Sequence, residues 1–199
     1  RDLHLSIRRQ RQMCIRDRDD LNPSANEESW GTSIGGTVDG PTNAAIGNNS
    51  FIYDYTVSDG IALKAAYKPS GATGVLKSST EFGVQYTGME GLTVSAAMGE
   101  NNDAASQIDL SVLNIKYAMG PITVGYQTNE SDSGAASADE DFTAYGISYA
   151  VNDDVSVSYG ASSLDYSSAL EDQESSAVSI SFTAGGVCLL YTSPSPRDS

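Results

Sequence analysis

The chain has 199 residues, enough for one domain with a sizeable core, and its net charge of −15 argues against binding to nucleic acid. Its one histidine, His4, and its two cysteines, Cys14 and Cys188, lie near the ends. The interval 19–187 therefore cannot hold a Ser-His or Cys-His catalytic pair or a histidine-based metal site. No run in the sequence approaches the roughly 18 apolar residues of a membrane-spanning helix.

Both ends differ in composition from the interval between them. Residues 1–18 contain six arginines, whereas 19–187 contains no arginine, four lysines and 23 acidic residues, a net charge of −19. A basic arm that binds nucleic acid is one interpretation of 1–18. The two ends also resemble translated sequencing-adapter sequence, so we treat 1–18 and 188–199 as non-native flanks and exclude them from the fold prediction. On this interpretation the interval between them is a piece of a longer protein.

After a polar stretch at 19–50, which we predict to be a long ordered loop, apolar and small or polar residues begin to alternate. A period of two predicts strands with one apolar face. The phase of the alternation slips at Leu113, where we expect a bulge or an ordered loop segment. The nine alternating runs that we predict to be strands are 51–57, 61–67, 82–86, 92–98, 108–119 with its phase slip, 122–127, 143–149, 155–159 and 178–182.

Short turns recur at regular intervals along this part of the chain. They begin near residues 58, 88, 119, 152 and 184, at steps of 30–33 residues, and longer polar loops lie between them. Short turns between alternating runs indicate antiparallel hairpins. The pattern predicts an all-β meander over 51–187 with nine complete strands and the start of a tenth, and it favours an up-and-down barrel over a Greek-key sandwich.

Tyrosines recur near the ends of the predicted strands, on their apolar side. The opposite side is mostly Gly, Ala, Ser and Thr with few charges. A tyrosine has an apolar ring and a hydroxyl that prefers water, which suits the boundary of a membrane. Strands of about ten alternating residues with an aromatic band are typical of outer-membrane barrels. The alternative is a soluble sheet with a half-buried tyrosine face. The tyrosines predicted to lie at a lipid interface are Tyr67, Tyr86, Tyr117, Tyr126, Tyr149 and Tyr159.

The hairpin at 117–127, the paired runs 51–55 and 61–67, and the run 143–149 together resemble the general diffusion porins of Gram-negative bacteria, particularly the alphaproteobacterial type. The resemblance covers about residues 30–186 and rests on the texture of the hairpins. It implies an antiparallel, up-and-down transmembrane β-barrel of the bacterial outer membrane, sixteen-stranded and trimeric when complete. It also implies a water-filled channel for passive diffusion of small hydrophilic solutes and ions, without catalysis and without a cofactor.

If the apolar face meets lipid, the charged residues on the opposite side of the strands point into the lumen; they are Asp54, Lys64, Lys68, Glu81 and Lys116. By position, 19–50 matches the constriction loop of the family. Carboxylates on that loop opposite lysines on the wall would set a transverse field across the pore. The residues predicted for the constriction are Glu27, Glu28, Asp39, Lys64 and Lys116. The excess of acidic residues predicts a preference for cations, although solvated outer loops also explain much of the acidity.

Other chemistry finds little support in the sequence. The adjacent carboxylates at Glu27/Glu28, Asp153/Asp154 and Glu171/Asp172 fit solvated turns and loops better than general acid–base pairs. Residues 129–140 follow the spacing of a calcium loop only loosely, which leaves a structural calcium among the loops as an open alternative. The competing function is a secreted or surface-attached, acidic, soluble β-protein of the adhesin-like kind, folded as a sandwich, with the tyrosine face buried.

Overall fold

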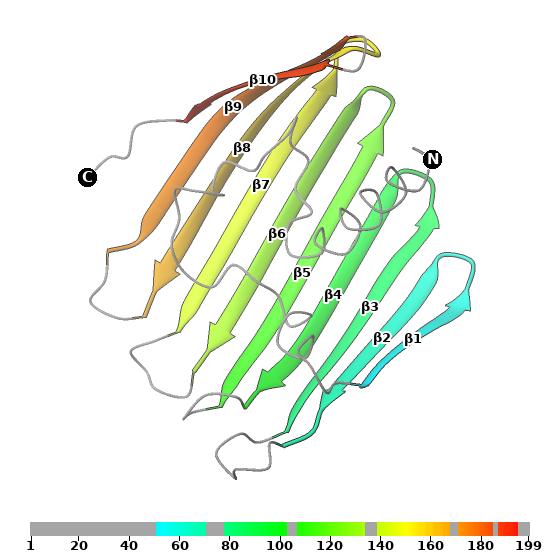
Figure 1. Cartoon of the computed structure of the whole chain (residues 1–199), viewed down its shortest axis with the longest axis vertical. Coiled ribbons are helices and arrows are strands. Elements are labelled where there is room, and N and C mark those ends of the chain that lie inside the picture. The colour runs from blue at the N-terminus through cyan, green and yellow to red at the C-terminus, as the bar shows by residue number, and fades with distance from the viewer. Residues whose placement is uncertain are drawn as a thin grey trace, which may run out of the picture.

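The computed structural model describes residues 51–70, 78–102, 107–133, 139–167, 171–184 and 187–194. Within these ranges ten strands form one antiparallel sheet in which each strand pairs with the next along the chain (Figure 1). The predicted up-and-down order is confirmed. The strands are β1 Phe51–Ser58, β2 Ile61–Lys68, β3 Ser79–Met89, β4 Leu92–Asn101, β5 Ile108–Met119, β6 Ile122–Asp132, β7 Glu140–Ala150, β8 Val155–Tyr166, β9 Gln173–Ala184 and β10 Val187–Pro194.

The short turns lie along one edge of the sheet and are tied to one another. Gly60, Gly91 and Gly120 supply the positive φ angles (91°, 76° and 57°) that the first three of these turns need. Backbone hydrogen bonds of 2.7–2.8 Å then connect each of the first three hairpins to the next; they run from Thr87 N to Gly60 O, from Ala118 N to Gly91 O and from Ala150 N to Pro121 O. We call this edge the short-turn rim and the opposite edge the long-loop rim.

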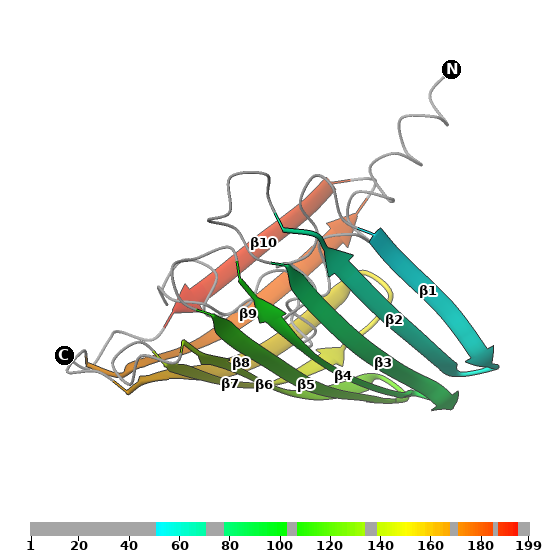
Figure 2. The ribbon, with the colours of Figure 1, turned by 90° about the horizontal axis from the view of Figure 1, so that it is seen from below.

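The sheet is curved, and β1 and β10 rise on the same side of it (Figure 2). Its two faces differ sharply. The outer face carries the tyrosines, among them Tyr67, Tyr126 and Tyr149, and its large side chains are exposed. The inner face carries small and polar residues, among them Asn114 and Ser158; most of its described residues are half-buried or buried, and those of β1 are exposed. One side of each strand is therefore apolar and the other is not, as the period of two predicts.

Strand β5 corrects one prediction. The phase slip at Leu113 is not a bulge, because β5 pairs without interruption with β4 and with β6 along its length. Ile108, Leu110 and Val112 instead lie on the inner face, while Asp109 and Ser111 lie on the outer face. The apolar side of this strand changes near the long-loop rim, and the backbone remains regular. Register shifts do occur elsewhere, between Thr56 and Ser58 and between Tyr86 and Met89.

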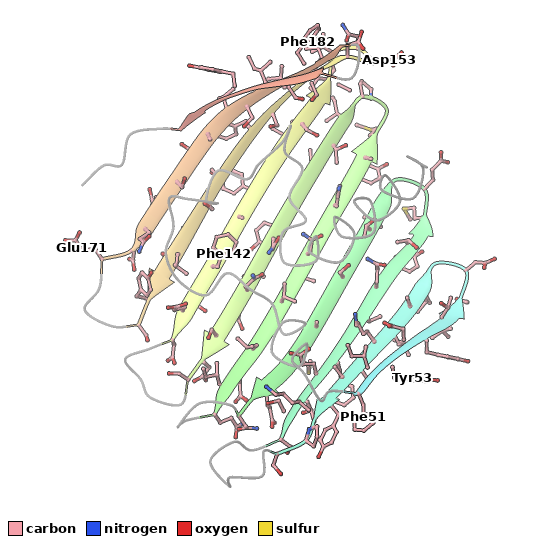
Figure 3. The ribbon with its side chains drawn as sticks, in the orientation of Figure 1. Phe51, Tyr53, Phe142, Asp153, Glu171 and Phe182 are labelled. Atoms are coloured by element: carbon pink, nitrogen blue, oxygen red, sulfur yellow. The ribbon has the colours of Figure 1, made fainter. Side chains whose placement is uncertain are left out.

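The inner face holds a small apolar core. Phe142, Ala144 and Leu164 are fully buried, and Tyr166 packs against them. Phe142 lies near the middle of the sheet, on β7 (Figure 3). It pairs directly with Leu164 on β8 and with Asn129 on β6. Asn129 lies between Phe142 and Val112 in this row, so a buried polar side chain separates the cluster from the apolar inner residues of β5.

The domain plan predicted from the sequence stays a prediction. β10, at Val187–Pro194, pairs with β9, although most of it belongs to the segment 188–199 that the sequence sets aside as a flank. The flank at 1–18 and the loop predicted for 19–50 lie outside the described residues. Among the residues that are described, no helix is long and apolar enough to cross a membrane.

Candidate functional site

The outer face exposes far more apolar surface than a water-soluble monomer normally shows. Phe82 is 61% exposed, Met98 65% and Tyr145 53%. Cross-strand neighbours on this face include Tyr126 beside Tyr145 and Val124 beside Ile147. Further exposed members are Phe51, Tyr53, Tyr55, Leu63, Val84, Ile115, Tyr117, Val178, Ile180 and Phe182. Together they form a continuous apolar band across the strands. We call it the outer band.

The outer band runs diagonally across the strands. One row of cross-strand neighbours shows this clearly: it is apolar on β2–β5 and polar on β6–β9. The row is Leu63, Val84, Ala96, Leu113, Thr128, Thr143, Ser163 and Glu174. A second row, nearer the short-turn rim, is apolar as far as β9; it contains Met119, Ile122, Tyr149, Val157 and Ile180.

The slope of the outer band gives the tilt of the strands. The edge of the band that faces the long-loop rim moves from Tyr67 on β2 to Val178 on β9. This is a shift of about one residue for each strand crossed. With a rise of about 3.4 Å per residue and a strand spacing of about 4.8 Å, the strands are inclined by about 35° to the normal of the band. Strands of transmembrane barrels are tilted by about 35–45°. A flat apolar slab therefore fits the outer band when the strands cross it at the usual tilt.

Aromatic residues mark the edges of the outer band. Tyr67, Tyr126 and Tyr159 lie on the edge of the band that faces the long-loop rim. Tyr86, Tyr117 and Tyr149 lie on the edge that faces the short-turn rim. All six of these predicted interface tyrosines are on the outer face and 37–46% exposed. Their contact with a lipid interface stays a prediction. Between the outer band and the long-loop rim the outer face becomes acidic, with Glu100, Asp109, Glu130, Asp132, Asp141 and Asp165.

The five charged residues predicted for a lumen wall all lie on the inner face. Lys64 Nζ is 3.9 Å from Asp54 Oδ1, and these two residues are direct cross-strand neighbours. Glu81 is almost fully buried beside Ala66 and Gly99. Lys68 pairs with Ser79, and Lys116 lies between Thr93 and Gly125. Their action on a pore stays a prediction. Glu27, Glu28 and Asp39 lie outside the described residues, so their opposition to Lys64 and Lys116 also stays a prediction.

A comparison with known families agrees with this geometry. The family described as Gram-negative porin matches residues 19–192. The chain belongs to the Gram-negative porin family. Its strands are therefore transmembrane strands of a β-barrel channel in the bacterial outer membrane, and the family is a class of channels and not of enzymes. The match begins at residue 19, where the composition of the sequence changes, and it includes part of β10. A search of curated proteins finds no match to the chain.

The inner face of the porin contains a polar row that the sequence analysis did not single out. Gln85, Ser95, Asn114 and Gln127 are successive cross-strand neighbours on β3–β6. Asn114 and Gln127 are each 1% exposed. A cavity of about 390 Å³ opens on the inner face beside the row, over β1–β5. The signal in the sequence was the position of these polar residues on the side of each strand opposite the apolar residues, but only the strand register shows that they adjoin.

The two acidic pairs of the porin that fall within the described residues lie at the rims of the sheet. Asp153 and Asp154 lie at the short-turn rim, where Asn152 Oδ1 accepts hydrogen bonds from Asp154 N and Val155 N, and Glu171 lies at the long-loop rim (Figure 3). Asp172 Oδ1 accepts a hydrogen bond of 3.1 Å from Tyr166 N. Over the described ranges, no group of three or more His, Cys, Asp or Glu side chains is arranged to hold a metal ion. A structural calcium among the loops stays a prediction.

Proposed function

We propose that this porin forms a water-filled channel through which small hydrophilic solutes and ions diffuse passively, with a preference for cations and without a cofactor. The observation that carries the proposal is the division of the sheet into two faces. The outer band exposes Phe, Tyr, Ile and Val side chains, which favour hydrocarbon over water. The inner face carries Gly, Ser, Asn, Gln and a few charges, which suit a wet lumen.

The proposed cation preference is supported by charge at the long-loop rim and not by charge on the wall. The lysines Lys64, Lys68 and Lys116 on the inner face outnumber the carboxylates Asp54 and Glu81 among them by one, so these wall residues do not themselves favour cations. In contrast, the described residues of β4–β9 near the long-loop rim include no lysine or arginine, and they include carboxylates on both faces. A rim of one sign concentrates ions of the opposite sign at the mouth of a channel. The carboxylates predicted for the constriction at 19–50 would act in the same direction.

We further propose that the complete protein is a homotrimer that contacts outer-membrane lipid along the outer band. The trimer is supported by the family resemblance alone. Lipid contact is supported by the extent and tilt of the outer band. A complete channel would present its inner face to water and, outside the contacts between protomers, its outer band to lipid.

The test of the channel is conductance of the complete protein in a planar lipid bilayer under a potassium chloride gradient. We expect stepwise, ohmic openings with a reversal potential of the sign that cation preference produces. A reversal potential of the opposite sign would contradict the cation preference and leave the channel intact. A monodisperse protein that stays in water and never inserts would instead support the secreted acidic β-protein.

A further inference from the structure

The cavity on the inner face has two different ends. Asp54 and Lys64 line it on the side of β1 and β2, where Asp54 is 67% exposed. Asn114 lines it on the side of β5, where it is almost fully buried. Its volume of about 390 Å³ lies within the range of about 300–1,000 Å³ that is usual for small-molecule sites. The cavity is therefore open toward the charged pair and closed at Asn114.

The hollow follows from the sequence of the strands that form it. Ala62, Gly83 and Ala97 line the cavity with side chains of one carbon or none. Lys64, Gly83 and Ala97 are successive cross-strand neighbours, and Gly83 brings no side chain to the middle of this row. A Cβ atom at Gly83 would already lie 3.4 Å from the Cβ of Ala97. Gly83 and Ala97, paired on adjacent strands, and Ala62 in the neighbouring row with Gln85 therefore make the space, and larger residues would close it.

Asn114 is the unusual residue of this cavity. It is 1% exposed, yet neither its Oδ1 nor its Nδ2 has a hydrogen-bond partner in the described structure. Buried polar groups are nearly always paired, so an unpaired carboxamide facing a cavity calls for a partner from outside the protein. A carboxamide provides an acceptor oxygen and two donor hydrogens from one nitrogen. It therefore suits a group that both donates and accepts hydrogen bonds.

The neighbours of Asn114 narrow the chemistry of that partner. Gln85 and Ser95 belong to the same row and also line the cavity, and Gln85 Nε2 donates a hydrogen bond of 3.3 Å to Ser95 Oγ. All three side chains are neutral, and the charges of Asp54 and Lys64 at the open end compensate each other. A charged solute would find no counter-charge at the closed end, whereas adjacent hydroxyl groups match the amides and the serine.

We propose that this cavity is a binding subsite for a small neutral solute with several hydroxyl groups, a monosaccharide or polyol, and that Asn114 holds it together with Gln85 and Ser95. The inference rests on the proposed function, because the subsite is useful only if solutes pass along the inner face. It extends that function from unspecific diffusion to weak recognition of neutral sugars within the channel. Such binding slows a solute briefly and interrupts the ion current while the site is filled.

The experiment measures the block of ion current by glucose in bilayers that contain the complete porin. A short polyethylene glycol of similar size serves as the comparison, because its chain offers few donors. We expect glucose to block the wild-type channel at lower concentration than the polymer does. In Asn114→Leu, which keeps the volume and removes the hydrogen bonds, the glucose concentration for half block should rise about five- to thirtyfold. Block by the polymer should not change.

Ser162→Ala is the matched control. Ser162 Oγ is also buried and unpaired within the described structure, but Ser162 does not line the cavity. Its removal should leave the glucose block unchanged. If Asn114→Leu fails to insert, Gln85→Leu at the exposed part of the row provides the same test.

The subsite would be overturned, and the channel left standing, if glucose and the polymer block the open channel at the same concentration. The same holds if glucose blocks Asn114→Leu at the concentration that blocks wild type. Absence of any conductance from the wild-type protein would overturn the proposed function itself, and the subsite with it. An equal change in Asn114→Leu and Ser162→Ala would also overturn the subsite, because it would show a general effect of buried polar groups on the channel.

Discussion

A lysine in place of Ile147 tests whether the outer band lies in hydrocarbon. Ile147 is 44% exposed on β7, with Tyr145 and Tyr149 on either side of it on the same face. Its cross-strand neighbours are Val124 and Tyr159, so it lies well inside the band. An ammonium group at this position would replace a methyl group that faces lipid.

The expected cost follows from the depth of the site. A lysine that points outward near the middle of a membrane destabilises a transmembrane barrel by about 2–4 kcal/mol. At 1.4 kcal/mol for each factor of ten, the folding equilibrium of Ile147→Lys should fall by about 30- to 700-fold. The matched control is Ser148→Lys, one residue along. Ser148 lies on the inner face between Thr123 and Ser158, where a lysine can reach water.

The assay is urea titration of folding into lipid vesicles, with the folded fraction read from gel mobility without boiling. We expect the midpoint of Ile147→Lys to fall well below those of wild type and Ser148→Lys. An exposed isoleucine on a water-soluble sheet tolerates lysine within about 0.5 kcal/mol. Equal midpoints for the two variants would therefore refute the placement of the outer band in lipid.

Three further changes test other parts of the structure. Gly91→Ala should lower the free energy of unfolding by about 1–3 kcal/mol, because φ is 76° and the new Cβ would clash with the carbonyl oxygen of Ala118. Gly120 also has a positive φ but open space around it, so Gly120→Ala should lower the free energy of unfolding less in the same urea titration. The reverse order would contradict the contact between the turns. Phe142→Ala removes a fully buried ring and should cost about 3–5 kcal/mol by that titration; a loss below about 1 kcal/mol would show that the inner core is not packed. Lys116→Gln should move the reversal potential further toward cations, and no shift would place its charge outside the conduction path.

The order of the strands could be predicted from the sequence because every pairing is local. Each strand pairs with the next across a short turn or a single loop. Gly60, Gly91 and Gly120 mark three of the short turns, because their positive φ angles favour glycine. The face of each residue follows from its parity along the strand. Parity alone therefore predicts the correct side of the sheet for the charged residues Asp54, Lys64, Lys68, Glu81 and Lys116.

The failures came from information that does not lie within one strand. In β5, the apolar residues change faces near the long-loop rim, and alternation alone cannot distinguish a change of environment from a bulge. The cavity depends on the pairing of Gly83 with Ala97 and of Gln85 with Ser95, which only the register reveals. A pattern read along one strand does not contain these pairings.

The central claim is that the outer band faces lipid and the inner face meets water, and one measurement tests both halves. Single spin labels at positions 147, 148, 149 and 150 of β7, with Cys14 and Cys188 changed to serine, would be compared in vesicles for collision with oxygen, which enters lipid, and with a water-soluble nickel complex. We expect opposite phases: oxygen contact highest at 147 and 149, and nickel contact highest at 148 and 150. Labels at 147 and 149 that meet neither reagent, or that meet mainly nickel, would contradict it, because the outer band would then be packed against protein or exposed to water.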